Sequence, residues 1–359
     1  MTDRERFSGI MDYRRVDRLP LYWFGLWDET AARWRDEGWD GTTESLGLDP
    51  DWEDGMWSSH GLAVPGPLPT RSDEVVGEDG EYFFVRTGLG ALEKRAKLGG
   101  TIPLHLEEAL SPTREAWESF KRFLDPFDSR RLIPDLEETI ARVNAGDRTV
   151  AILGGSFFGW PRDWMGLMNW SYLCYDDPVL YEEIIAYLAD FFTALYEPVL
   201  TRARVDLVYF FEDCCGSTGP LLSPDTYQRL YHRHYRRSID FYRAHGVRHI
   251  LIDSDGKTDD LIPCWLKSGF DIIFPVEVGS WRTDPAVLRR RFGKDLRMMG
   301  GVDKHVIPLG EEAIRRHLSA LRPLVEEGGF IPMPDHRVPP DCSLAQFRTY
   351  TRVFREVFA

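Results

Sequence analysis

The chain has 359 residues, of which 43% are hydrophobic and 28% are charged, an ordinary globular composition with enough length for a large core. Its formal net charge of −14 argues against broad binding to nucleic acid, which requires basic surfaces. No apolar run approaches the roughly 20 residues that span a bilayer. The five cysteines form no CxxC pair. We therefore expect a cytoplasmic protein that binds neither nucleic acid nor a membrane.

The first 147 residues mix regular elements with turn-rich stretches. Periodicity, alternation and capping residues predict helices at 2–11, 26–37, 111–123 and 133–144, a strand at 21–25, and a hairpin formed by 81–86 and 92–97. Residues 38–80 are rich in Gly, Pro and Asp and show no clear period. We treat residues 38–147, approximately, as an irregular insertion.

From residue 148 onward, strands and helices alternate in a regular order. Short apolar runs predict strands at 149–153, 206–211, 247–252, 270–275, 296–299 and 329–332. The segments between and after them predict helices at 177–205, 223–245, 257–267, 284–292, 311–327 and 343–359. This order is typical of βαβ units, and with residues 21–25 the strands approach eight. We predict an α/β fold, a single (β/α)8 TIM barrel over residues 1–359 that carries the N-terminal insertion.

Two aspartates follow the predicted strand at 247–252. Asp253 and Asp255 are two residues apart, so on an extended segment their side chains point the same way and can share one cation or one substrate. The carboxyl ends of barrel strands are where active sites lie. The alternative is that Asp253 and Asp255-Gly256 only form a turn.

Most of the other predicted strands also end in polar residues, which together form an acidic rim with one histidine. In strand order these residues are Glu212 and Asp213, Asp253 and Asp255, Glu277, Asp303, and Asp335 and His336. Crowded carboxylates repel one another and raise each other's pKa, and a divalent metal would relieve this. Ion pairs with Lys257, Lys304 or Arg337 are the competing explanation.

His336 and the adjacent acids Glu212 and Asp213 each have a structural alternative to a functional role. His336 lies in a proline-rich loop after a strand, where Asp335 or Asp341 could orient its ring, and we favour a functional role over a structural one. Glu212 and Asp213 point to opposite faces, so only one of them is expected to reach a pocket.

A set of motifs, in a fixed order along nearly the whole chain, resembles the uroporphyrinogen decarboxylase-like superfamily. The motifs are RERF at 4–7, VDRLP at 16–20, ED at 212–213, GPLLSP at 219–224, DSDG at 253–256, FPVE at 274–277, GGVDK at 300–304, GGFIP at 328–332 and DHRVPPD at 335–341. The superfamily includes true decarboxylases and cobalamin-dependent methyltransferases. Its decarboxylases bind four substrate carboxylates through N-terminal arginines, whereas this chain has Trp23, Phe24 and Trp27 there and no arginine before Arg33.

The resemblance therefore implies the methyltransferase branch. That branch holds zinc through a His-x-Cys motif and a later Cys, and here the first pair aligns with Asp253 and Asp255 while the later Cys falls near His336. With Glu277, these residues would hold a divalent metal, zinc by preference, through oxygen and nitrogen ligands. Such a metal suits an ether or alcohol oxygen better than a thiol.

The expected function is methyl transfer or O-demethylation between a small methylated substrate, such as an aryl methyl ether, and a corrinoid carried by a separate partner protein. The expected catalytic residues are Asp253, Asp255, His336 and Glu212, and the expected substrate-binding residues are Trp23, Phe24, Trp27 and Arg337. A homodimer is also implied as an oligomer of the family. The alternatives are a metal-independent decarboxylase-like lyase that uses Asp and His as acid and base, and a non-catalytic barrel that binds a tetrapyrrole or a corrinoid protein.

Overall fold

A computed structural model describes residues 1–49, 59–69, 71–97, 103–131 and 133–359. Its main sheet has six parallel strands in the order β12-β11-β10-β9-β6-β5. Their bounds are β5 Ala151–Gly155, β6 Leu207–Phe211, β9 His249–Asp253, β10 Ile272–Val276, β11 Arg297–Val302 and β12 Phe330–Pro334. These strands are almost entirely buried, as expected of parallel strands covered on both faces. The predicted α/β class and all six predicted strands of this region are confirmed.

Helices connect and follow these strands. They are α6 (Gly159–Met165), α7 (Leu167–Asp176), α8 (Pro178–Leu200), α9 (Pro224–Thr226), α10 (His232–Ala244), α11 (Ile262–Ser268), α12 (Pro285–Phe292), α13 (Glu311–Glu327) and α14 (Leu344–Val357). Asp177, Ser223 and Asp284 each cap a helix whose next residue is proline, which is preorganised for the first helical position. The predicted helix at 223–245 is interrupted by a π-helical turn, η5 (Tyr227–Tyr231).

The predicted strand at 21–25 is not formed as a strand. Its end is instead tied to the segment after β12, because Leu26 forms a parallel bridge with Val338 and the Val338 N–H donates to Gly25 O at 3.0 Å. Beyond the opposite edge of the sheet, His60 Nδ1 lies 3.0 Å from Ala151 O of β5. Both edges of the six-stranded sheet are therefore flanked by N-terminal segments, an arrangement compatible with the predicted barrel.

The predicted insertion contains more regular structure than expected. It holds an antiparallel sheet made of β1 (Glu74–Glu78), β2 (Tyr82–Arg86), β3 (Leu92–Ala96) and β4 (Leu104–Glu107), followed by α4 (Arg114–Phe120) and α5 (Leu136–Ala145). The β2–β3 pair is the predicted hairpin. Residues 50–58, 70, 98–102 and 132 of this segment lie outside the described residues.

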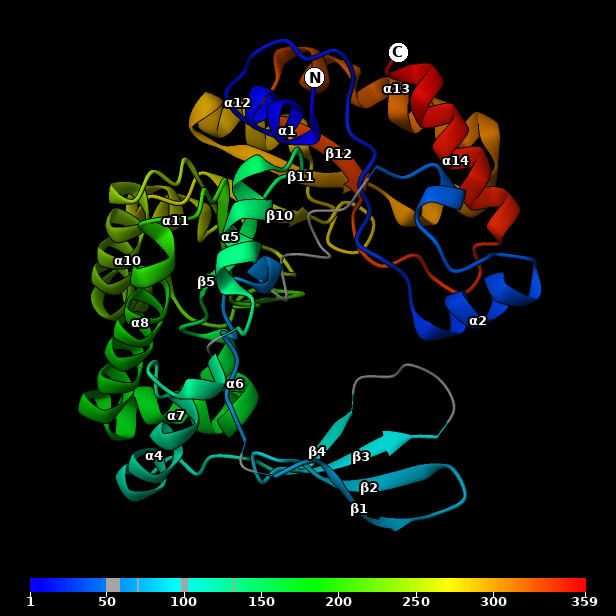
Figure 1. Cartoon of the computed structure of the whole chain (residues 1–359). Helices are drawn as coiled ribbons and strands as arrows, with labels where there is room; N and C mark the ends of the chain where they lie inside the picture. The colour runs from blue at the N-terminus through cyan, green and yellow to red at the C-terminus, as the bar shows by residue number, and fades with distance from the viewer. Residues whose placement is uncertain (50–58, 70, 98–102, 132) are drawn as a thin grey trace.

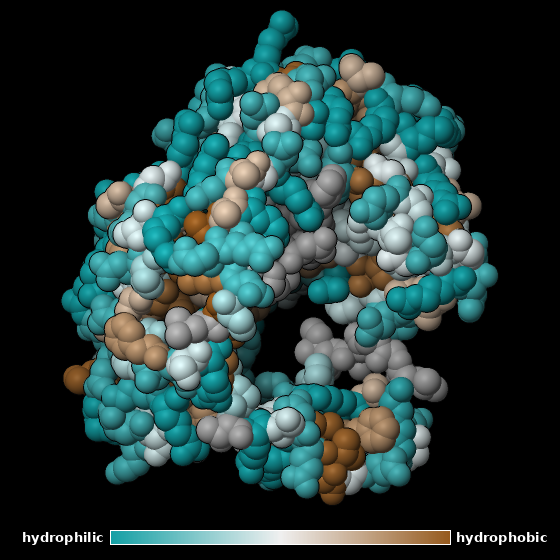
Figure 2. Space-filling model, in the orientation of Figure 1, coloured by the Kyte–Doolittle hydropathy of each residue, from teal (hydrophilic) through white to brown (hydrophobic). Residues whose placement is uncertain are grey.

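The four-stranded sheet stands apart from the body, on the side where α6 and α7 lie (Figure 1). The Leu110 N–H donates to Trp164 O at 2.9 Å, which attaches the end of this sheet's segment to α6, the helix that follows the carboxyl end of β5. Figure 2 shows an opening between the body and this sheet. The carboxyl ends of the main strands thus lie on the same side of the body as the insertion.

The remaining elements are short. They are α1 (Asp3–Met11), α2 (Asp28–Asp36), β7 (Cys215–Gly216), β8 (Gly219–Pro220), and the one- or two-turn helices η1 (Glu44–Leu46), η2 (Ser59–Gly61), η3 (Lys121–Leu124), η4 (Ser129–Arg131), η6 (Gly293–Asp295) and η7 (Lys304–Leu309). No helix in the described part of the chain has the length and apolar character needed to cross a membrane.

Candidate active site

Three of the predicted site residues meet at the carboxyl ends of β9, β10 and β12. His336 Nε2 lies 3.4 Å from Asp255 Oδ2. Glu277 joins them through the loop after β9, because its Oε2 accepts a hydrogen bond from the Gly256 N–H at 3.0 Å. Since β9 and β10 are neighbours in a parallel sheet, their carboxyl ends lie at one edge and bring these side chains together.

Two aromatic rings from the N-terminal segment stack against the His336 ring. Phe24 stacks on it with a centroid distance of 4.6 Å and an interplanar angle of 19°, and Trp27 lies at 5.9 Å and 30°. Phe24 also stacks on Phe274 of β10 at 5.0 Å. These contacts limit the orientations of the imidazole and leave its Nε2 edge toward Asp255.

Two carboxyl groups of the cluster have raised pKa values. Burial, and then the charge of Asp255, raise the pKa of Glu277 to about 7. Burial and Asp255 also raise the pKa of Asp213, whose Oδ1 accepts the Asp255 N–H at 3.0 Å. Asp255 Oδ1 is buried and has no hydrogen-bond partner among the described residues. The cluster can therefore hold and release a proton close to neutral pH, as an acid–base site requires.

Arg162 supplies positive charge beside Asp213, and the charge of Lys304 lowers the pKa of Glu277. Arg162 of α6 donates to Asp213 O at 2.6 Å, and its Nη2 lies 3.6 Å from Asp213 Oδ2. Lys304, which the sequence suggested as a balancing charge, pairs with the buried Asp335 at 3.7 Å. Arg337 donates to Leu26 O at 3.2 Å and lies over the Trp27 ring. Arg337 thus fastens the aromatic segment to the loop after β12.

Several predicted rim residues support loops. Asp335 is fully buried and accepts the N–H groups of Val278, Gly279 and Lys304 at 2.9, 2.8 and 3.1 Å. Asp303 caps η7 by accepting the His305 N–H at 2.9 Å.

The buried environments of Glu212, Asp253 and Trp23 differ from that of the cluster. Glu212 is fully buried, and its carboxylate accepts N–H groups of Phe157, Phe158 and Gly159 at the start of α6. Burial nevertheless raises the pKa of Glu212 to about 7.

Asp253 is buried at the last position of β9, and its main-chain oxygen accepts the Glu212 N–H at 2.8 Å. Trp23 is predicted to contact substrate, but its ring packs against Phe347 of α14 at 5.7 Å and belongs to the core.

The sequence assigned no specific role to Arg162 or Phe274, and it placed Asp213 in the acidic rim without preferring it to Glu212. For Asp213 a signal existed, because alternation put it opposite Glu212, and the structure shows Asp213 as the one beside Asp255. Arg162 lies seven residues after β5, a position from which no spacing rule predicts contact. Phe274 looked like an ordinary residue of a buried strand.

The donor types at the site suit a divalent metal, since two carboxylates and one imidazole are common zinc ligands. In the described residues, however, no three His, Cys, Asp or Glu side chains are arranged so that they could hold one ion. The orphaned Asp255 Oδ1 is a ligand atom still free to bind. The metal site at Asp253, Asp255, Glu277 and His336 stays a prediction.

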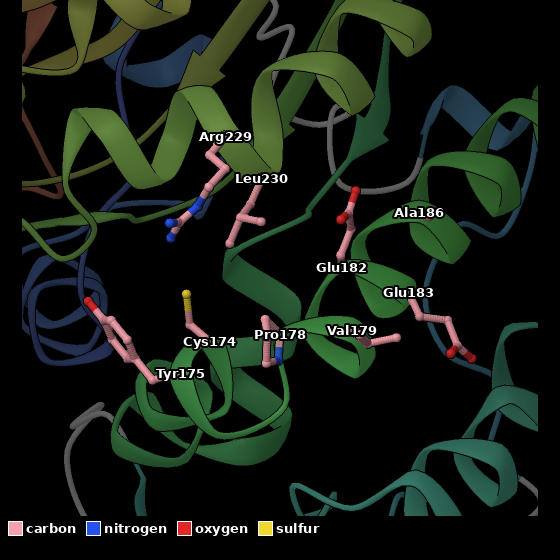
Figure 3. A pocket seen from close by; sticks show the side chains of 9 residues that line it. All are labelled: Cys174, Tyr175, Pro178, Val179, Glu182, Glu183, Ala186, Arg229 and Leu230. Atoms are coloured by element: carbon pink, nitrogen blue, oxygen red, sulfur yellow. The ribbon is translucent and has the colours of Figure 1, made fainter.

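A hollow of about 660 Å³ lies elsewhere, between the start of α8 and η5 (Figure 3). Its lining residues are Cys174, Tyr175, Pro178, Val179, Glu182, Glu183, Ala186, Arg229 and Leu230. None of the predicted site residues lines it, so it is separate from the strand-end cluster.

An α/β sheet with an acid–imidazole cluster at the carboxyl ends of its strands defines an enzyme-like class of fold and site. The sequence profile described as uroporphyrinogen decarboxylase (URO-D) matches residues 123–357, well over half of the chain. The chain belongs to the uroporphyrinogen decarboxylase (URO-D) family.

Two solved structures are similar to this chain. A methyltransferase from Methanosarcina mazei is 13% identical, covers 100% of both chains and superposes with a TM-score of 0.58. A B12-independent methionine synthase from Shewanella sp. W3-18-1 is also 13% identical, over 59% of this chain and 64% of that chain, with a TM-score of 0.39. The first of these likenesses shows a shared fold. No curated protein matches the sequence.

Proposed function

We propose that the protein is a methyltransferase-type enzyme that moves a methyl group between a small methylated substrate, such as an aryl methyl ether, and a corrinoid on a separate partner protein. The observation that carries the proposal is the His336–Asp255 pair, with Phe24 and Trp27 stacked against the imidazole and Glu277 bonded to the loop that carries Asp255. The full-length fold shared with a methyltransferase supports it.

The aromatic segment also argues against a tetracarboxylate substrate. A porphyrinogen would need several cationic side chains at the site. Of the arginines near the cluster, Arg162 contacts Asp213, and Arg337 is bonded to Leu26 O. Aromatic surface from Phe24 and Trp27 suits a planar, weakly charged substrate better.

In the proposed reaction, Glu277, Asp255 and His336 handle the proton that the leaving oxygen requires. A reduced corrinoid on the partner protein would supply the nucleophile that accepts the methyl group, and the substrate oxygen would keep the electron pair of the broken C–O bond. Glu277, whose pKa of about 7 keeps part of its population protonated near neutral pH, donates a proton to that oxygen so that the product leaves as a neutral alcohol or phenol. Asp255 holds His336 in place, and the imidazole returns a proton to Glu277 from solvent. If zinc is bound by Asp255, Glu277 and His336 instead, it would polarise that oxygen as a Lewis acid in place of the proton donation.

A direct assay tests the proposal. Purified protein is incubated with reduced free cobalamin and a panel of methyl ethers and methylated alcohols, and formation of methylcobalamin is followed by its absorbance. We expect a methylated product with at least one ether and a loss of about 100-fold or more in Asp255→Asn and His336→Ala, the scale of a lost acid–base group. Asp260→Asn, a matched change at an exposed position of the same loop, is expected to keep activity.

Two further assays on the purified protein distinguish methyl transfer from the lyase and from the non-catalytic binding barrel. Release of CO₂ from a carboxylated porphyrinogen, abolished by His336→Ala, would instead establish a decarboxylase-like lyase that uses the same acid and base. Tight binding of a corrinoid protein, without turnover of any methylated or carboxylated compound, would establish a non-catalytic binding barrel.

Metal content is measured independently of turnover. Protein grown with added zinc is analysed for bound elements, and we expect about one zinc per chain in the wild type. We expect a clear loss of zinc in Asp255→Ala and His336→Ala but not in Asp260→Ala. Equal, substoichiometric zinc in all four proteins would remove the metal from the proposal and leave the acid–base roles intact.

A further inference from the structure

A separate hollow lies at the amino-terminal ends of β9, β10 and β11, at the opposite end of the strands from the candidate site. His249 is the first residue of β9, Asp271 immediately precedes β10, and Arg297 is the first residue of β11. All three line a broad hollow of about 840 Å³. Residues from the end of α1, the end of α10 and η6 complete its wall.

The hollow is basic in an otherwise acidic protein. Five cationic side chains line it, namely Arg236, Arg243, Arg248, Lys294 and Arg297, against the three carboxylates Asp12, Asp271 and Asp295. Five positive and three negative charges leave a net charge of +2, whereas the whole chain carries −14. A basic concavity on an acidic protein attracts anions selectively.

Two of these cations are not neutralised. Arg243 pairs with Asp271 at 3.0 Å and Arg248 pairs with Asp12 at 2.8 Å. In the described chain, Lys294 and Arg297 have no carboxylate within ion-pair distance. Lys294 lies over the Tyr13 ring at 5.0 Å, and Arg297 donates its Nε to Met11 O at 2.6 Å, which leaves its terminal nitrogens available.

His249 supplies an independent observation that points to a ligand. His249 is only 2% exposed and lines the hollow, and neither ring nitrogen has a hydrogen-bond partner within the part of the chain that the structure describes. Asp12 Oδ1 lies 3.5 Å from Nε2, but without hydrogen-bond geometry. A buried polar group without a partner is uncommon and is satisfied when a bound molecule supplies the missing contact.

We propose that this hollow binds the phosphate group of a small phosphorylated compound. Lys294 and the terminal nitrogens of Arg297 supply charge-assisted hydrogen bonds to the phosphate oxygens, and a His249 ring N–H supplies another. Leu266 and Phe270, which also line the hollow, offer apolar contact to the rest of the molecule. The ligand would contact the starts of the strands whose ends carry Asp255 and Glu277, so it is placed to influence the candidate site through β9 and β10.

Calorimetry with inorganic phosphate and pyrophosphate tests the proposal on the full chain, at constant ionic strength set with sodium chloride. We expect saturable binding that weakens at least about tenfold, or about 1.4 kcal/mol, in Lys294→Gln. Arg316→Gln, which removes one exposed positive charge elsewhere, should leave the affinity unchanged. Lys294 is preferred over Arg297 for the main variant because its side chain makes no hydrogen bond that the fold would lose.

NMR of the labelled histidine rings gives a second readout. The His249 ring resonances should shift as phosphate saturates, while those of the exposed His305 should stay in place. Absence of saturable binding, or equal weakening in Lys294→Gln and Arg316→Gln, would overturn the proposal. Stronger binding of an acidic peptide than of pyrophosphate would also overturn it, by assigning the surface to a protein partner.

Discussion

Neighbouring side chains set the properties of the single histidine in the site. Phe24 and Trp27 stack against the ring of His336, and Asp255 lies at its Nε2 edge. A chemically similar residue one position away, Trp23, is turned into the core against Phe347. Adjacent residues of an extended segment face opposite ways, so only one of the two aromatic side chains can reach the site.

Replacement of Phe24 by leucine tests the importance of this stacking. Leucine keeps apolar contact but loses the ring that fixes the imidazole, and aromatic stacking of this kind contributes about 0.5–1.5 kcal/mol. We expect turnover to fall about two- to tenfold with little change in substrate affinity, measured as separate kcat and KM. Phe127→Leu at an exposed position should leave both constants unchanged.

Glu277 should make the stability of the protein depend on pH. Its pKa rises from 4.5 to about 7 on folding, so between these values the folded chain holds a proton that the unfolded chain has released. The free energy of unfolding therefore falls as the pH rises from about 4.5 to about 7, and the raised pKa of Glu212 acts in the same direction.

In Glu277→Gln this contribution is absent, so the loss of stability between about pH 5 and about pH 7.5 should be smaller than in the wild type. Urea unfolding of both proteins at these two pH values measures the change in the free energy of unfolding. An identical pH dependence in the two proteins would show that Glu277 titrates normally in the folded state.

Among the elements, the tight turn after β9 determines whether the cluster can form. Gly256 has φ of +92°, and its N–H bonds to Glu277. A Cβ there would lie 2.7 Å from the backbone carbonyl group of Cys215. The turn thus has both a conformational and a steric reason for glycine.

The two reasons can be separated by a matched pair of alanine substitutions. Gly310 has the same φ of +92°, but a Cβ there would have no neighbour within 4 Å. Gly310→Ala should cost about 1–2 kcal/mol from backbone strain alone. Gly256→Ala should cost more and should also lower activity. Equal unfolding midpoints in urea would show that the loop moves to accept the methyl group.

The elements predicted from sequence were those with a strong local pattern. Fully apolar runs gave the six parallel strands, and Asp-Pro or Ser-Pro starts marked helices such as α8 and α12. The strand predicted at 21–25 was wrong, because its apolar residues are buried by packing and only Leu26 forms a bridge. The π-helical turn at Tyr227–Tyr231 has no pattern of its own in the sequence.

Local sequence patterns likewise identified only part of the candidate site. Asp255, Glu277 and His336 were found because each follows a strand, and the topology brings such positions together. Arg162 and the stacking of Phe24 on His336 depend on how distant segments pack, which no local pattern encodes. Glu212 looked equivalent to Asp213 in sequence, and only the fold shows its carboxylate facing the start of α6.

At the scale of the whole molecule, the surface of α7 predicts self-association. Met168, Tyr172 and Tyr175 follow a helical spacing along α7 and are 57–76% exposed, and Val179 at the start of α8 is 70% exposed. An apolar stripe of this kind is typical of an interface. We expect light scattering to give a mass near twice the 41.5 kDa of one chain. Tyr175→Glu should shift it toward the monomer, whereas a constant dimer mass would place the interface elsewhere.

The bridge between Leu26 and Val338 has a consequence for biosynthesis. Thr30 and Trp34 of α2 also bond to main-chain oxygens more than 300 residues later, at Val338 and Cys342. During translation, Phe24 and Trp27 therefore leave the ribosome long before His336. Phe24 can stack on Phe274 once β10 has been made, but neither ring can contact His336 until nearly the whole chain has been synthesised. Premature termination anywhere before residue 336 yields a polypeptide without a competent site.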